Sequence, residues 1–190
     1  MHEAANSIGR MAARGTTSTK ARLVAWEDMS NEQREREIVK LWRIRRTVYT
    51  MLSDRGYLVA ASELNQTLAD FRRIMVPGTL EGFQHDNLMI IVGRKEDPAT
   101  QTIVFFNGET QIGVQPLRRY SEKMRELSAQ TCIIVYRGTT SGFVRHTLAD
   151  YKETMQVFEE EELIVNITEH SLVPKHTVLT EEEKKQLLER

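Results

Sequence analysis

The chain has 190 residues, of which 40% are hydrophobic and 28% are charged, which is enough apolar material for one or two folded domains. Its 26 basic and 27 acidic residues give a formal net charge of -1, which argues against a protein that holds nucleic acid mainly through a strong positive field. No stretch approaches 18 consecutive apolar residues, so we expect no membrane-spanning helix, and the single cysteine cannot form an internal disulfide.

The charges are unevenly distributed along the chain. Residues 1–150 carry 21 basic and 17 acidic side chains, whereas residues 151–190 carry 5 basic and 10 acidic ones. A difference of this kind predicts two regions with different neighbours.

A flexible tail is predicted for residues 1–29, because their apolar residues have no sustained period. Arginines, hydroxyl side chains and few acids also fit a transit peptide. The segment 30–33, Ser-Asn-Glu-Gln, fits a capping box, so a long helix is expected from Ser30. Apolar residues then recur at helical steps as far as Leu52, and Gly56 is typical of the end of a helix.

The other face of this predicted helix is basic. Its cationic residues are Arg34, Arg36, Lys40, Arg43, Arg45 and Arg46. Such a face is either simply solvated or a surface for nucleic acid or an acidic partner, and both interpretations stay open.

Alternating helical and strand patterns follow. A second helical region is predicted at 62–75, and buried strands at 88–92, 103–106 and 132–136. Asp97-Pro98 predicts an antiparallel hairpin between the first two strands, and a helix from Pro116 predicts a right-handed parallel crossover between the second and third. Residues 30–150 therefore predict one α/β domain.

The composition changes in the last 40 residues. An acidic run at 159–162 is followed by a predicted strand at 163–167 and by a capping box at 180–183 that predicts a short helix. Residues 151–190 are too few to bury a core by themselves, so we expect them to be incomplete without a further segment or a partner.

Catalytic motifs are scarce in this sequence. It has no phosphate-binding glycine loop or nucleophile elbow, its histidines lack metal-ligand spacing, and Cys132 lies inside an apolar run that predicts an inert thiol. No cofactor and no metal are expected. One enzyme hypothesis is a Mg²⁺-dependent nuclease with Asp86 and Glu109 as metal-binding acids, although Gln111 stands where such sites place a lysine.

Two segments carry a resemblance to a known family. The first spans 41–57 (LWRIRRTVYTMLSDRGY), and the second spans 165–176 (VNITEHSLVPKH) with 179–184 (LTEEEK) after it. Together they resemble the fifth-largest subunit shared by the eukaryotic nuclear RNA polymerases I, II and III, and the second alone resembles the archaeal counterpart of that subunit. The resemblance covers about residues 39–190, and a divergent paralogue that serves one polymerase is a second interpretation.

The resemblance implies a fold and a mechanical function. It implies an α/β jaw domain over 30–150, with a restriction-endonuclease-like core that lacks the active site, and a small α+β assembly domain over 151–190 that is truncated here. A non-catalytic subunit of this kind docks on the largest subunit and lines the channel for downstream DNA. It works in the nucleus, or in the nucleolus if it serves polymerase I alone. The rival interpretations are the nuclease and a free-standing adaptor protein.

The resemblance also implies two sets of contact residues. The partner-binding residues are Glu169, His170, Leu172, Val173, Pro174, Lys175 and His176. The DNA-proximal residues are Arg137, Thr139, Thr140 and Ser141. Contacts of the second set with duplex DNA are expected to be few, weak and directed at phosphates, which makes them independent of base sequence. Members of that family often have a proline in this loop, and this chain has none.

Overall fold

The computed structural model describes residues 24–140, 142, 144, 146, 148, 151, 154–166 and 181–188. In these residues no helix is both long enough and apolar enough to cross a membrane. The order of elements is η1 (Trp26–Asp28), α1 (Asn31–Asp54), α2 (Ala61–Leu64), α3 (Leu68–Met75), η2 (Leu80–Gly82), η3 (His85–Leu88), β1 (Ile90–Gly93), β2 (Gln101–Asn107), β3 (Gln111–Ile112), α4 (Val114–Glu126), β4 (Thr131–Tyr136), β5 (Thr139–Thr140), β6 (Met155–Glu159), α6 (Glu160–Leu163) and α7 (Glu181–Leu188).

Four strands form the main sheet in the order β1-β2-β4-β6. β1 runs antiparallel to β2, as the hairpin prediction has it, with Ile90 opposite Val104. β4 runs parallel to β2, which confirms the predicted parallel pairing of the two strands joined through α4, and β6 runs parallel to β4. A separate parallel pair, β3 and β5, lies where β2 and β4 end. The described part of the chain is therefore a mixed α/β fold.

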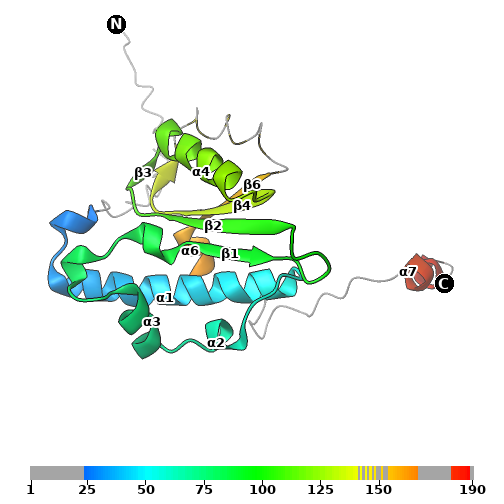
Figure 1. Ribbon diagram of the computed structural model, residues 1–190, viewed down its shortest axis with the longest axis horizontal. Coiled ribbons are helices and arrows are strands. Elements are labelled where there is room, and N and C mark those ends of the chain that lie inside the picture. Colours follow the sequence, from blue (N-terminus) through cyan, green and yellow to red (C-terminus); the bar gives the residue numbers. More distant parts are fainter. Residues whose placement is uncertain are drawn as a thin grey trace, which may run out of the picture.

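The sheet is covered on both faces, with α1 on one side and α4 on the other (Figure 1). Alternation along β2 produces this arrangement: Val104 and Phe106 pack toward α1, whereas Ile103 and Phe105 pack toward α4. On the second face the ring of Phe105 stacks on that of Tyr120 with centroids 4.4 Å apart. Full burial of each such side chain contributes about 1.5–3 kcal/mol, so the sheet is held from both faces.

The long helix α1 forms as the sequence predicts. The hydroxyl of Ser30 accepts from the Gln33 amide while the Gln33 side chain accepts from the Ser30 amide, which is the predicted capping box. After the helix, Gly56 has a φ of 83°, which a side-chain-bearing residue rarely adopts. The apolar stripe faces the sheet, and its fully buried members are Ile38, Leu41, Ile44, Val48 and Leu52.

Two predicted elements have different bounds in the structure. The helical region 62–75 is divided into α2 and α3, because the Thr67 hydroxyl accepts from the Asp70 amide and starts a new helix there. The first strand begins at Ile90 rather than Leu88, since Leu88 closes the 3-10 turn η3.

The strand predicted at 163–167 is wrong. The strand near that position is β6, which ends at Glu159, and the acidic run itself forms α6. A reciprocal capping box between Glu159 and Glu162 starts this helix. The acidic run therefore contains the residues that begin the helix. β6 pairs with β4, so residues 155–159, which follow the predicted boundary at residue 150, belong to the main sheet.

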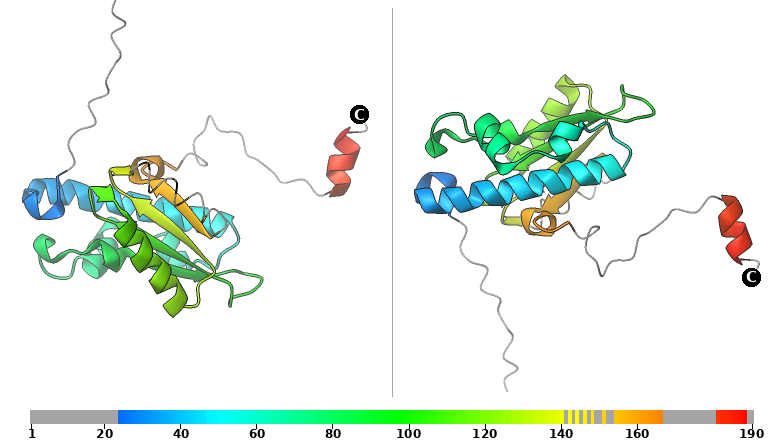
Figure 2. Two further views of the ribbon diagram at one scale, coloured as in Figure 1. Left: turned by 90° about the horizontal axis from the view of Figure 1, so that it is seen from above. Right: turned by 90° about the horizontal axis from the view of Figure 1, so that it is seen from below.

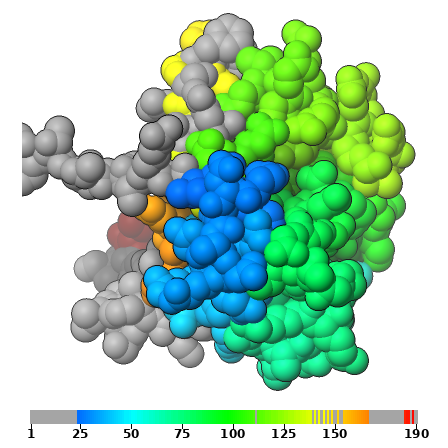
Figure 3. Space-filling view, turned by 90° about the vertical axis from the view of Figure 1, so that its left-hand side faces the viewer, coloured from blue at the N-terminus to red at the C-terminus, as the bar shows by residue number. Residues whose placement is uncertain are grey.

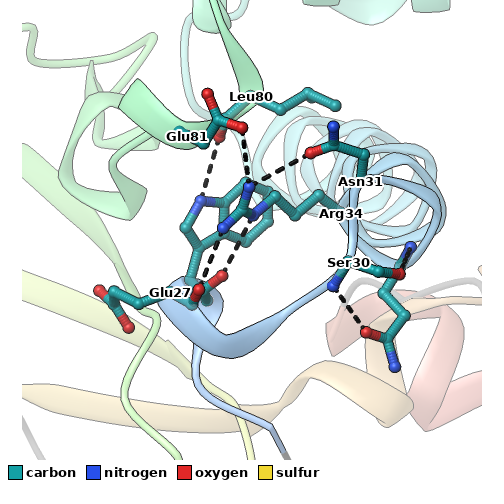
Figure 4. A network of polar contacts seen from close by, with 8 residues as sticks. Glu27, Ser30, Asn31, Arg34, Leu80 and Glu81 are labelled. Carbon is teal, nitrogen blue, oxygen red and sulfur yellow. Dashed lines mark hydrogen bonds and ion pairs between the residues drawn. The ribbon is translucent and has the colours of Figure 1, made fainter.

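Part of the predicted tail packs against the domain. Trp26 and Met29 are buried, and the Trp26 indole donates to the Leu80 carbonyl at 3.1 Å. Figure 4 shows how Arg34 holds this turn: its guanidinium donates to the carbonyl oxygens of Trp26 and Glu27. In Figure 3 the blue N-terminal turn lies against the neighbouring green part of the chain. Residues 1–23 lie outside the described residues.

Candidate interface at the carboxyl end of the sheet

The carboxyl ends of β2, β4 and β6 lie at one edge of the sheet because these strands are parallel to one another. Buried polar residues gather there: Asn107, Arg137 and Glu160 are 3%, 4% and 2% exposed. In open α/β sheets this edge is where binding sites are built. The predicted DNA-proximal loop begins at the same edge.

Arg137 is the first residue of that loop and is buried beneath it. Its Nε lies 3.7 Å from a carboxylate oxygen of Glu37 on α1. Its Nε and Nη1 are buried and make no hydrogen bond within the described part of the chain. The next residue, Gly138, has a φ of 89°, a backbone conformation that a side-chain-bearing residue rarely adopts. Arg137 is therefore buried in this structure, whereas the sequence suggests a contact with phosphates.

Two further charges complete what we call the buried charge cluster, which consists of Glu37, Lys40, Arg137 and Glu160. The Lys40 ammonium donates to Glu160 at 2.5 Å and to Glu37 at 3.4 Å. Burial opposes the charge on Lys40, but attraction to Glu160 and Glu37 outweighs it and raises the pKa of Lys40. Burial also raises the pKa of Glu160, and Lys40 offsets only part of that effect.

His85 lies beside this cluster. Burial, together with the positive charges of Arg137 and Lys40, lowers the pKa of His85 to about 4 even though Glu27 opposes the shift. The ring makes edge contacts with Trp26 and Phe83, and its buried Nε2 has no hydrogen-bond partner among the described residues. At neutral pH the His85 ring is therefore uncharged, and it packs between Trp26 and Phe83.

The predicted DNA-proximal residues are only partly described. Thr139 and Thr140 form β5 and pair with Gln111 and Ile112 of β3, so the loop is tied to the end of the sheet. Ser141 lies outside the described residues, and so do the predicted partner-binding residues Glu169, His170, Leu172, Val173, Pro174, Lys175 and His176.

The two acids of the nuclease hypothesis, Asp86 and Glu109, both lie near α4. Asp86 lines a pocket of about 210 Å³ beside α4, and Glu109 pairs with Arg119 at 3.0 Å. Among the described residues no group of three or more His, Cys, Asp or Glu side chains is placed to hold a metal ion. Cys132 is 1% exposed, and burial raises the pKa of its thiol to about 12.

Sequence reasoning missed the roles of Glu37, Lys40 and Glu160. Glu37 and Lys40 flank the apolar stripe of α1 at Ile38 and Leu41, which is the one signal that they lie near the core. For Glu160 there is no local signal, because its burial follows from the pairing of β6 with β4.

Two parts of the sequence match known protein domains. Residues 35–124 match the family model for the N-terminal domain of RNA polymerase Rpb5, and residues 165–190 match that for its C-terminal domain. These ranges contain the two segments that carry the resemblance, at 41–57 and 165–176.

Three relatives illustrate the similarity. The chain is 41% identical over 160 residues to the RNA polymerases I, II, and III subunit RPABC1 of Caenorhabditis briggsae, with 82% of this chain and 75% of the relative covered. It is 36% identical over 158 residues to the Dictyostelium discoideum subunit of the same name, with 81% and 75% covered. It is 33% identical over 155 residues to the DNA-directed RNA polymerase subunit 5-like protein 1 of Arabidopsis thaliana, with 80% and 73% covered. The chain therefore belongs to the Rpb5 family, the non-catalytic structural subunits of DNA-directed RNA polymerases.

Proposed function

We propose that this subunit docks on the largest polymerase subunit through its C-terminal region and forms one wall of the channel for downstream DNA. One observation carries the proposal: the half-buried Lys40, next to the first family motif, pairs with the buried Glu160, five residues before the second motif. This pair fixes α6 against α1. The chain that leads to the docking segment therefore starts from a fixed point on the α/β domain.

The α/β domain is the proposed jaw. Its parallel β2-β4-β6 core, with helices on both faces, fits a restriction-endonuclease-like core. Gln111 in place of a lysine, and the pairing of Glu109 with Arg119, fit the absence of nuclease chemistry.

The loop after β4 is the proposed point of contact with DNA. Thr139, Thr140 and Ser141 offer hydroxyl and backbone amide groups that bind phosphates without reading bases. Arg137 has a different role in this proposal from the one its sequence position suggests. It fixes the base of the loop against Glu37 rather than touching DNA itself.

The partners follow from the names of the relatives. The Caenorhabditis and Dictyostelium relatives are named as subunits of RNA polymerases I, II and III, so we place this chain in the nuclear enzymes. Glu169, His170, Leu172, Val173, Pro174, Lys175 and His176 are the proposed contact with the largest subunit. A nucleolar location follows only for a chain that serves polymerase I alone.

A photocrosslinking residue at Thr140 tests the position of the loop. We expect it to crosslink to downstream duplex DNA in purified, transcribing polymerase, with equal yield on unrelated DNA sequences. The matched control is the same residue at Ile74, which is 53% exposed on α3 and should not reach the duplex. A Thr140 yield on DNA no higher than that from Ile74 would contradict the proposed jaw position.

A second experiment tests docking. Replacing Leu172 and Val173 by aspartate should abolish recovery of the largest subunit with a tagged chain, because buried carboxylates oppose an apolar contact. Unchanged recovery would contradict docking through this segment.

A further inference from the structure

A groove runs along α1 opposite the turn between β6 and α6. Figure 2 shows β6 and α6 beside the middle of α1 in both views. The groove has a part of about 770 Å³ and a part of about 350 Å³. Thr47 and Asn166 line both parts, so the two adjoin and form one surface.

The larger part has an apolar floor. It is lined by Met51, Val157, Phe158, Leu163 and Val165. Val165 is 58% exposed, and Phe158 is only partly buried, with the Arg55 guanidinium over its ring. Apolar side chains gathered in a hollow of this kind are typical of an interaction surface.

The smaller part is basic. Arg43 and Arg46 line it, and both side chains are exposed. Neither forms an ion pair with any described residue.

The other basic residues of α1 are already used by the protein. Arg34 donates to carbonyl oxygens of the N-terminal turn, Arg36 pairs with Glu32, Lys40 pairs with Glu160, and Arg45 donates to Gln66 and Tyr49. Of the six cationic residues that make this face basic, Arg43 and Arg46 alone have no such side-chain contact within the described part of the chain, and these two lie in the groove.

We propose that this groove, which we call the α1–β6 groove, binds an acidic and hydrophobic peptide segment of another protein of the transcription complex. Apolar side chains of the segment occupy the floor at Phe158 and Val165, and its carboxylates reach Arg43 and Arg46. The planar guanidinium fork binds a carboxylate with two parallel hydrogen bonds, which makes arginine suited to this contact. The inference rests on the proposed function, because it takes the partner from the polymerase.

A peptide fits this groove better than a nucleic acid does. Exposed carboxylates of Asp54 and Glu162 line the apolar part and would repel a phosphate backbone. The groove is lined by three arginines, of which Arg55 already donates to Gln156 and lies over Phe158, and this is few for a nucleic-acid surface, which neutralises a row of phosphates. The apolar floor also has no partner in a sugar–phosphate chain, whereas a polypeptide carries apolar and acidic side chains together.

A photocrosslinking residue at Thr47 tests the proposal, because Thr47 lines both parts of the groove. The chain is tagged, purified with its polymerase, irradiated, and the crosslinked peptide is sequenced by mass spectrometry. We expect a segment of another protein that contains both acidic and apolar residues. Crosslinks to nucleic acid, crosslinks to this chain itself, or the absence of a crosslinked protein would each overturn the proposal.

Charge reversal supplies the matched comparison. Arg43→Glu with Arg46→Glu should lower the yield of that crosslink about tenfold, as expected for loss of two central charged contacts. Arg118→Glu with Arg125→Glu makes the same change of charge at two exposed residues of α4 and should leave the yield unchanged. Equal yields from the two double variants would overturn the proposal.

An apolar test separates the two halves of the groove. Val165→Asp should also lower the yield, whereas Leu58→Asp, at a leucine 50% exposed elsewhere, should not. Equal effects of these two substitutions would contradict the apolar contact. Recovery of the largest subunit by the unmodified chain is recorded first. Its absence contradicts the proposed function, whereas recovery without the crosslink contradicts the groove alone.

Discussion

The ammonium of Lys40 lies 2.5 Å from the Oε2 of Glu160, although 120 residues separate the two in sequence. The side chain of Glu160 is 3% exposed, while that of Lys40 is 25% exposed and has Glu37 as a second partner. The pair therefore joins α1 to α6. Glu160 needs Lys40 to balance its buried charge, whereas Lys40 also has Glu37 and solvent.

This asymmetry predicts unequal effects of removing each charge. Lys40→Met leaves a buried carboxylate without its closest cation and should cost about 3 kcal/mol in the free energy of unfolding. Glu160→Gln removes the buried charge and leaves Lys40 with Glu37 and solvent, so it should cost less. Urea unfolding of both variants and of the double variant measures this, with a double-variant cost below the sum of the single costs. A larger cost for Glu160→Gln than for Lys40→Met would contradict the cluster as described.

His85 predicts a pH dependence of stability. Its pKa is about 4 in the folded protein and about 6.5 in an unfolded chain. The unfolded state therefore takes up the proton first as pH falls, so this contribution is fully present above pH 6.5 and is lost between pH 6.5 and pH 4. A tenfold change in proton affinity corresponds to about 1.4 kcal/mol, so the loss is about 3 kcal/mol.

Comparison of variants isolates this effect from the titration of carboxyl groups. Unfolding free energies at pH 7, 6, 5 and 4 should show a shallower decline for His85→Gln than for the unchanged protein. His146→Gln, at an exposed histidine, serves as the control and should keep the original decline. Parallel curves for the unchanged protein and His85→Gln would show that His85 is not buried as a neutral ring.

We expect that lysine cannot replace Arg34 at the start of α1. Its Nε and Nη2 donate to two different carbonyl oxygens, of Trp26 and Glu27, and an ammonium group cannot reproduce that fork. We expect Arg34→Lys to cost about 1–3 kcal/mol, the range for loss of buried hydrogen bonds. Trp26 fluorescence during chemical unfolding measures the loss, and Arg36→Lys, at an exposed pair with Glu32, should be nearly neutral. Equal stability of the two variants would mean that Arg34 does not hold the turn.

Gly108 lies beside His85, where there is no room for a side chain. A Cβ at this position would overlap the ring of His85, which is confined by Trp26 and Phe83. Gly108→Ala should therefore cost about 1–3 kcal/mol, as overpacking of a filled site does. At Gly82 the nearest atom to a new Cβ is 3.9 Å away, so Gly82→Ala is the control. Thermal unfolding should show a lower midpoint for Gly108→Ala alone, and an unchanged midpoint would contradict the packing described.

Local sequence signals were sufficient for α1, β2, α4 and β4. α1 has the box of Ser30 and Gln33, and β2 and β4 have apolar runs. α4 has an apolar stripe at helical steps, although it begins at Val114 rather than at Pro116. The error at 163–167 arose because Leu163–Ile167 has the same apolar run, while the strand that pairs with β4 has the less apolar sequence MQVFE. Pairing with a distant strand decided that case, and no local pattern reports it.

The site was less predictable than the fold for the same reason. The position of Arg137 after β4 suggested an exposed phosphate contact, but Glu37 on the distant helix α1 lies beneath the loop and the guanidinium turns inward to it. Burial of Trp26 likewise depends on Leu80 and Phe83, which no pattern within residues 1–29 could show.

The central claim is that this chain works as part of a nuclear RNA polymerase. Affinity purification of the tagged chain from nuclear extract, with quantitative mass spectrometry of the recovered proteins, tests it most directly. The account predicts recovery of the largest subunits of polymerases I, II and III, and recovery of one of them alone would identify a polymerase-specific paralogue. Recovery of the chain without any polymerase largest subunit would contradict the account and favour a free-standing adaptor.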